Sequence, residues 1–241
     1  MRAFLIAALL LASGELLQAS TVSVQADDSS GFSDAQGADL LSGSVLLGTF
    51  QLANGTAMSD SAVQAFAMDI SGLLSHFTRF STTEAHIQQG SSNPGELSVA
   101  LNGTTATTPT LVGKQIYYLV VSGTDNSTVA ASLATARQVG VYYLDKAFFT
   151  GTVRDGDWAF PDDNDFIPER TVDIADLTTN NLGVSLLSGG YSHVVIGTFG
   201  PDHSNAHPTA FNFELANIPE PSAGLMLTAG AGLLLRRRRR R

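Results

Sequence analysis

Between residues 20 and 217, the sequence contains a series of short runs rich in β-branched and aromatic residues, each bounded by Gly, Asn, Asp or Ser. Runs of this length and composition are typical of β-strands. Alternation is clearest near the end of the series, where Phe211, Phe213 and Leu215 would point to one face of a strand. We expect strands at residues 21–26, 45–51, 97–101, 115–122, 139–149, 171–174, 184–187, 193–199 and 210–215.

Two helices are predicted among these strands. Apolar residues recur with helical spacing from Val63 to Phe77, and Ser59–Ser61 can cap the start of that helix. Gly72 lies inside the pattern and costs up to about 1 kcal/mol relative to Ala. A second short helix is expected from Thr128 to Arg137, capped by Ser127. Many strands and few helices indicate a mainly β fold, and we expect a jelly-roll-like β-sandwich with the longer helix over one end or edge.

The composition excludes several classes of protein. The chain has no cysteine, which rules out disulfides, zinc–thiolate sites, iron–sulfur clusters and cysteine nucleophiles. Residues 20–217 contain six basic and 20 acidic side chains, a net charge of −14. A surface this acidic argues against binding to nucleic acid or to an anionic membrane.

Residues 1–19 have the layout of a secretory signal peptide. Arg2 precedes an apolar run from Ala3 to Ala12, and the segment ends in Leu17-Gln18-Ala19. We expect cleavage after Ala19, with cleavage after Ala26 as the alternative. The alternative is an amphipathic or buried first helix, but the apolar run is too short to span a bilayer and lies at the very N-terminus, which favours a signal peptide.

Residues 218–241 contain three ordered parts. Pro219-Glu220-Pro221 interrupts regular structure, since proline fixes φ and lacks an N–H. The uncharged stretch 222–235 has 14 residues, which as a helix would reach about 21 Å against a bilayer core of about 30 Å. It is too short for a permanent anchor, and the positive-inside preference would hold the final basic cluster on the cytoplasmic side. That cluster is Arg236, Arg237, Arg238, Arg239, Arg240 and Arg241.

This segment resembles the PEP-CTERM sorting signal of Gram-negative and related bacteria: Pro219, Glu220 and Pro221 match its motif, and the apolar stretch and the arginines match its other two parts. The resemblance implies recognition by an exosortase, a membrane-embedded cysteine transpeptidase-like enzyme, after transient insertion in the inner membrane. Proteins with this signal are associated with exopolysaccharide, biofilm or floc. A looser resemblance, to PEP-CTERM proteins of Verrucomicrobia and Planctomycetes that imply no activity, is carried by residues 113–117, 138–142 and 158–161.

A short acidic stretch is a candidate calcium site, because Ca²⁺ prefers crowded hard oxygen ligands. Its spacing does not fit an EF-hand loop, and the alternative is a solvated acidic loop. Trp158 lies in the same stretch and is a candidate for stacking on a sugar ring, the alternative being a core residue. The candidate ligands are Asp155, Asp157, Asp162, Asp163, Asp165 and Glu169.

Signals for catalysis are sparse. The sequence contains no nucleophile-elbow, zinc-protease, phosphate-loop or dinucleotide motif, and its five histidines are scattered without a nameable set of zinc ligands. We therefore expect an exported cell-surface or matrix protein, associated with exopolysaccharide, with no catalysis and no cofactor of its own. A calcium-assisted carbohydrate-binding module and a secreted glycan hydrolase with an unidentified carboxylate pair are the alternatives. A melting temperature that rises with calcium would favour the first alternative.

Overall fold

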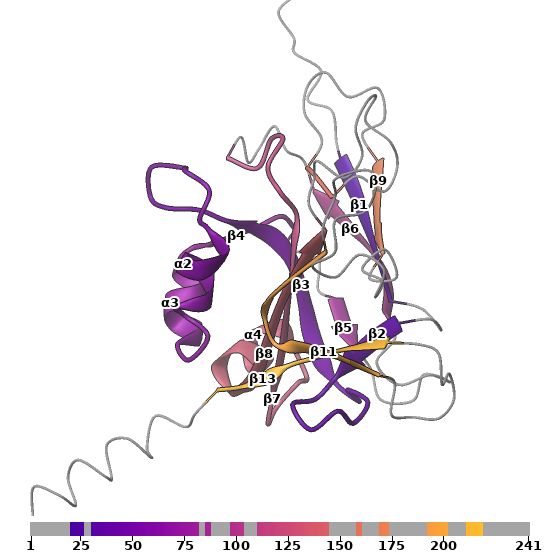
Figure 1. Cartoon of the computed structure of the whole chain (residues 1–241). Helices are drawn as coiled ribbons and strands as arrows, with labels where there is room; N and C mark the ends of the chain where they lie inside the picture. The colour runs from indigo at the N-terminus through magenta and orange to yellow at the C-terminus, as the bar shows by residue number, and fades with distance from the viewer. Residues whose placement is uncertain are drawn as a thin grey trace, which may run out of the picture.

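The computed structural model describes residues 20–26, 30–81, 85–87, 97–103, 110–144, 158–160, 169–173, 192–201 and 211–218. These residues form a mainly β fold with short helices (Figure 1). The helices are α2 (Asp60–Gln64), α3 (Ile70–Ser75) and α4 (Val129–Ala134). The strands are β1 (Ser20–Ala26), β2 (Ser30–Ser33), β3 (Gly43–Phe50), β4 (Phe77–Arg79), β5 (Ala85–Ile87), β6 (Leu97–Gly103), β7 (Tyr117–Gly123), β8 (Ala136–Leu144), β9 (Glu169–Asp173), β10 (Ser192–Ile196), β11 (Thr198–Pro201), β12 (Phe211–Glu214) and β13 (Ala216–Asn217).

The largest sheet has seven strands and forms the centre of the described fold. Its order is β10-β8-β7-β3-β4, with β13 also paired to β8 and β5 also paired to β3, all antiparallel. Every residue of β3 is buried, as are residues 117–121 of β7 and 139–144 of β8. Strands covered on both faces carry continuous apolar runs, which explains why these three segments show little alternation in the sequence.

Two pairs of tyrosines show what covers each face of the central sheet. Tyr118 and Tyr142 lie opposite each other on β7 and β8. The Tyr118 hydroxyl donates to the Val172 carbonyl of β9 at 2.6 Å, and the Tyr142 hydroxyl donates to the Glu214 carbonyl of β12 at 2.8 Å. Since neighbouring side chains on a strand point to opposite faces, Tyr117 and Tyr143 lie on the other face, where their ring centroids are 4.7 Å apart and the Tyr143 hydroxyl donates to Asp60 of α2. Figure 1 shows α2 and α3 together on one side of the central sheet.

Two three-stranded sheets complete the described strands. One has the order β6-β1-β9, with β1 antiparallel to β6 and parallel to β9, and the other has the order β11-β12-β2, with β12 parallel to β2. Figure 1 shows β1, β6 and β9 on the side of the central sheet away from α2 and α3. The mainly β class is confirmed. The finer expectation of a jelly-roll-like sandwich stays a prediction, because the described strands belong to three sheets.

Most of the expected strands are present, with one division that the sequence pattern did not predict. The run at 193–199 is split into β10 and β11 at Gly197, whose φ is +105°. A Cβ at Gly197 would meet the Glu214 carbonyl oxygen and would lie 2.7 Å from the Tyr142 hydroxyl, so the backbone here needs glycine. β2, β4 and β5 were not expected, and the expected strand at 184–187 lies outside the described residues.

The prediction of one helix from Val63 to Phe77 is wrong. The structure has two short helices instead, because Asp69 is non-helical (φ −137°, ψ 89°) and its side chain accepts the Gly72 N–H at 2.9 Å. A new N-cap therefore starts α3 inside the apolar pattern. Ser59 caps α2 as expected, accepting from the Ala62 N–H. In α4 the cap is Thr128 rather than Ser127, and the chain enters β8 at Ala136.

None of the helices in the described ranges combines the length and the apolar character needed to cross a membrane. The proposed signal peptide at 1–19 and the tail from residue 219 onward lie outside those ranges.

Candidate functional site

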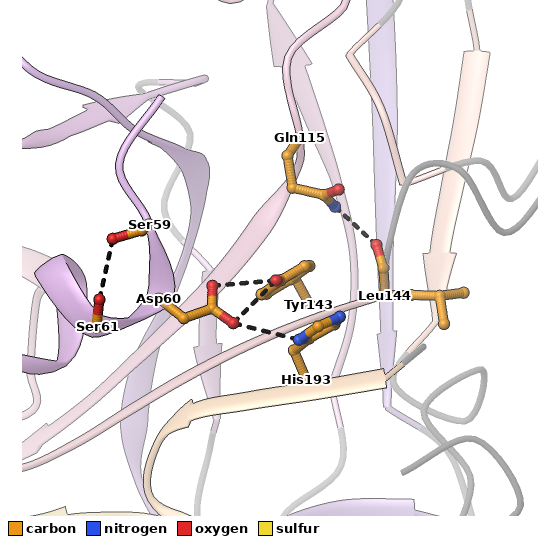
Figure 2. A network of polar contacts seen from close by, with 7 residues as sticks. All are labelled: Ser59, Asp60, Ser61, Gln115, Tyr143, Leu144 and His193. Carbon is orange, nitrogen blue, oxygen red and sulfur yellow. Dashed lines mark hydrogen bonds and ion pairs between the residues drawn. The ribbon is translucent and has the colours of Figure 1, made fainter. Parts of the chain in front are cut away.

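The candidate site is a polar cluster in which Asp60 of α2 contacts Tyr143 of β8 and His193 of β10. The Tyr143 hydroxyl donates to both carboxylate oxygens of Asp60, at 3.0 and 3.1 Å. His193 Nδ1 lies 3.2 Å from Asp60 Oδ2. Figure 2 shows the carboxylate beside the phenol and the imidazole, with contacts to both, and Ser59 and Ser61 at the start of the same helix. We call these three residues the Asp60 cluster.

Strand register brings the two rings of the Asp60 cluster together. His193 and Tyr143 are direct partners across the antiparallel pair β10–β8, and their rings stack with centroids 4.2 Å apart and planes 5° from parallel. Directly opposed side chains in an antiparallel pair interact closely. The Ser59 cap places Asp60 in the first turn of α2, from which its carboxylate reaches both rings.

The cluster favours a charged carboxylate. The hydrogen bond with His193 is the main reason that the pKa of Asp60 lies below its ordinary value of 3.8, and the Tyr143 hydroxyl adds to this effect. Partial burial acts in the opposite direction. The Asp60 side chain is 43% exposed and that of His193 is 29% exposed, so solvent screens part of the interaction.

An imidazole held at Nδ1 by a carboxylate is the arrangement that orients a general base in hydrolases. Such a base needs a hydroxyl or thiol nucleophile to activate. Within the Asp60 cluster, the His193 ring contacts a carboxylate and a stacked phenol, and the hydroxyl of that phenol donates to the same carboxylate. The geometry clearly provides polar contacts that hold α2 against β8 and β10 of the central sheet.

A second polar cluster joins α4 to the central sheet. The Ser44 hydroxyl of β3 donates to Ser132 of α4 at 2.8 Å and lies 3.3 Å from His86 Nδ1. Ser132 in turn donates to Asn126 Oδ1 at 3.0 Å. Ser44 and Ser132 are fully buried, so neither serine of this Ser–His contact is open to a substrate. The cluster satisfies polar groups in the core and positions α4.

The candidate calcium ligands are mostly beyond what the structure describes. Asp155, Asp157, Asp162, Asp163 and Asp165 fall outside the described residues, and Glu169 begins β9, with its Cα opposite Thr21 of β1. Within the described part of the chain, no three His, Asp or Glu side chains gather to hold a metal ion. The calcium site stays a prediction. The sorting motif Pro219-Glu220-Pro221 and the terminal arginines also lie outside the described residues.

Trp158 is placed by the structure in the core. Its side chain is fully buried and its ring lies 5.2 Å from the Tyr118 ring. Its carbonyl accepts hydrogen bonds from the Ile116 N–H and from Gln115 Nε2, each at 2.9 Å. Gln115 Nε2 also donates to the Leu144 carbonyl at 2.7 Å, as Figure 2 shows. A tryptophan enclosed in this way has no ring face free for a sugar, so the geometry corrects the sugar-contact hypothesis in favour of the core alternative.

The sequence did not single out Asp60 or Tyr143, and it placed His193 only among scattered histidines. A weak signal was present, since Ser59-Asp60 is a helix start and Tyr143 and His193 lie in expected strands. The contact between them depends on which strands pair and in which register, and strand composition does not specify either.

No family model, no curated protein and no solved structure matches the chain. The resemblance of the tail to a sorting signal is therefore carried by its own residues alone: Pro219-Glu220-Pro221, the uncharged stretch 222–235 and the arginines 236–241.

Proposed function

We propose that this chain is an exported cell-surface or matrix protein, sorted through its C-terminal segment by an exosortase-type enzyme and retained in or released to exopolysaccharide, with no catalysis of its own. The observation that carries the proposal is the order of the three parts in residues 218–241: a Pro-Glu-Pro motif, a short uncharged stretch and six arginines.

The lengths and charges of these parts suit a temporary anchor. A helix of about 21 Å is shorter than a bilayer core of about 30 Å, so it holds the chain only briefly. The arginines remain on the cytoplasmic side and keep the body outside. During processing, the enzyme's thiolate attacks a peptide carbonyl near Pro221, the C–N bond breaks, and the departing amine of the tail takes a proton. Water or an acceptor amine then displaces the thiolate and releases the body.

The properties of the body are consistent with this role. With a net charge of −14 over residues 20–217, it resists association with itself and with anionic surfaces. Its described core is built from buried apolar residues and needs no disulfide, so it can fold in any redox compartment.

The proposal is tested by the mass of the mature protein. The full chain is expressed in a bacterium that contains an exosortase-type enzyme, and surface-extracted protein is analysed by intact mass spectrometry. We expect a species that lacks the signal peptide and everything beyond about residue 222.

A variant in which all six arginines become glutamine should be misrouted and keep its tail, because the cationic stop is lost. The matched control replaces them with lysine, which preserves the charge, and it should be processed like the wild type. Surface protein that retains Arg236–Arg241, or wild-type protein that stays in the cytosol, would contradict the proposal.

A further inference from the structure

β13 is the point at which the folded body meets the sorting motif. Ala216 and Asn217 pair with Val139 and Gln138 of β8, and the Ile218 N–H donates to the Arg137 carbonyl at 2.6 Å. The next residue in the chain is Pro219. Among the described residues, the last one bonded to the central sheet is therefore followed directly in the sequence by the first residue of the motif.

The edge of β8 that holds β13 is shared with β10. β7 pairs with β8 from Ala136 to Tyr142 along one edge. A strand has two edges, so β13 and β10 both lie on the other, β13 beside residues 138–139 and β10 beside residues 141–144. β8 thus remains held by β7 and β10 when β13 is detached.

β13 itself is weakly held. It has two residues, of which Asn217 is exposed and Ala216 is half-buried, and Ile218 is also half-buried against the core. The side-chain contact from Gln138 Nε2 to Asn217 Oδ1 is long, at 3.4 Å, and exposed. Leu215, only 2% exposed, is the last fully enclosed side chain before the motif. Segments with few buried contacts and exposed backbone bonds open locally without unfolding of the whole domain.

An enzyme that cleaves a peptide bond needs several residues on both sides of that bond in an extended, accessible conformation, so cleavage beside a folded domain proceeds through local opening. We propose that β13 is a releasable clasp: residues 216–218 detach from β8 so that the processing enzyme can engage the motif, and this opening controls the rate of tail removal. The inference rests on the proposed function, because it concerns the same processing step.

A disulfide across the clasp provides a direct test. Gln138 and Asn217 are Cα partners in an antiparallel pair, whose spacing of about 4.5–5.5 Å suits a disulfide. The natural chain has no cysteine, so within one molecule of the variant Q138C/N217C the engineered thiols can pair only with each other, and disulfide-linked dimers are removed by gel filtration before the assay. Purified full-length precursor in detergent is mixed with membranes that contain the enzyme, and tail removal is followed by mass.

We expect oxidised Q138C/N217C to be processed about tenfold or more slowly than the wild type, and reductant to restore its rate. The matched control is T198C/E214C, which locks the opposed pair Thr198 and Glu214 on β11 and β12 and should be processed at the wild-type rate in both redox states. The wild type is also measured in both states, to account for any effect of reductant on the enzyme.

A second variant leaves the folded body unchanged. Insertion of eight Gly/Ser residues between Ile218 and Pro219 moves the motif away from the clasp. We expect this variant to be processed severalfold faster than the wild type. When the insertion is combined with the oxidised Q138C/N217C pair, we expect it to restore the processing that the disulfide alone slows. The inference would be overturned if oxidised Q138C/N217C, without the insertion, were processed at the wild-type rate, or if the insertion had no effect on the rate. Either result would leave the proposed function standing. A wild-type precursor that is never processed would overturn the proposed function itself.

Discussion

Tyr143 and His193 face each other across β8 and β10 with stacked rings, and both contact the same carboxylate, that of Asp60. One side chain from α2 is thereby fastened to two adjacent strands of the central sheet. The stacking depends on strand register and the two polar contacts depend on the position of α2, so the Asp60 cluster is sensitive to both.

The first prediction concerns the coupling within the Asp60 cluster. Tyr143→Phe keeps the ring but removes the hydroxyl that donates to Asp60, and we expect it to lower the free energy of unfolding by about 1 kcal/mol. In a double-mutant cycle with Asp60→Asn, measured by urea unfolding, the two effects should not add. Strictly additive effects would show that the phenol and the carboxylate do not stabilise each other.

The second prediction concerns pH. In the folded protein, the pKa of Asp60 lies below 3.8, mainly because of the hydrogen bond with His193, whereas in the unfolded chain it returns to about 3.9. A carboxyl with a lowered folded pKa stabilises the fold fully above the unfolded value, and this stabilisation is lost as the pH falls through the folded value. We therefore expect Asp60→Asn to reduce stability at pH 7 and to flatten the decline in stability between about pH 5 and pH 3.

The measurement is the urea midpoint of wild type and variants at several pH values between about 3 and 7. Tyr143→Phe is the matched control, since it keeps the titrating carboxylate and its main partner, His193, and should retain most of the wild-type slope. An Asp60→Asn variant with the full wild-type slope would mean that other carboxyls account for the acid sensitivity.

The third prediction separates backbone strain from steric overlap at two glycines. Gly55 and Gly197 both have positive φ, +79° and +105°. A Cβ at Gly55 meets nothing within 4 Å, whereas at Gly197 it would meet the Glu214 carbonyl and the Tyr142 hydroxyl. We expect Gly55→Ala to cost about 1 kcal/mol and Gly197→Ala about 3 kcal/mol or more, measured by thermal or chemical unfolding. Equal costs would indicate that β10 and β11 can shift apart without penalty.

The fourth prediction concerns the contact between the central sheet and the β6-β1-β9 sheet. The fully buried Tyr118 hydroxyl donates to the Val172 carbonyl, so Tyr118→Phe removes a hydrogen bond from an enclosed site. We expect a loss of about 1–3 kcal/mol, larger than for Tyr143→Phe at the more exposed Asp60 cluster. Hydrogen exchange at the β9 amides should accelerate in Tyr118→Phe, and unchanged protection there would count against a role for this bond in holding the two sheets together.

Several parts of the described fold were predictable because they depend on neighbouring residues. The composition of residues 45–51 and 115–122 predicted β3 and β7 nearly in place, and Ser59 was correctly expected to cap a helix. Phe213 and Leu215 are both buried, as their alternation indicated. The prediction of one long helix was wrong because periodicity indicates which residues face the core. It does not indicate that Asp69 leaves the helical conformation and caps a new helix.

The sequence by itself determined the mainly β class, the absence of disulfides and the positions of most described strands, because propensity, turn chemistry and charge act over a few neighbouring residues. The tertiary structure alone decided that β1 lies beside β9, that Trp158 is enclosed next to Tyr118, and that Asp60 meets Tyr143 and His193. These contacts join segments far apart in the chain. Strand order and register bring them together, and both follow from the packing of the whole core rather than from any local pattern.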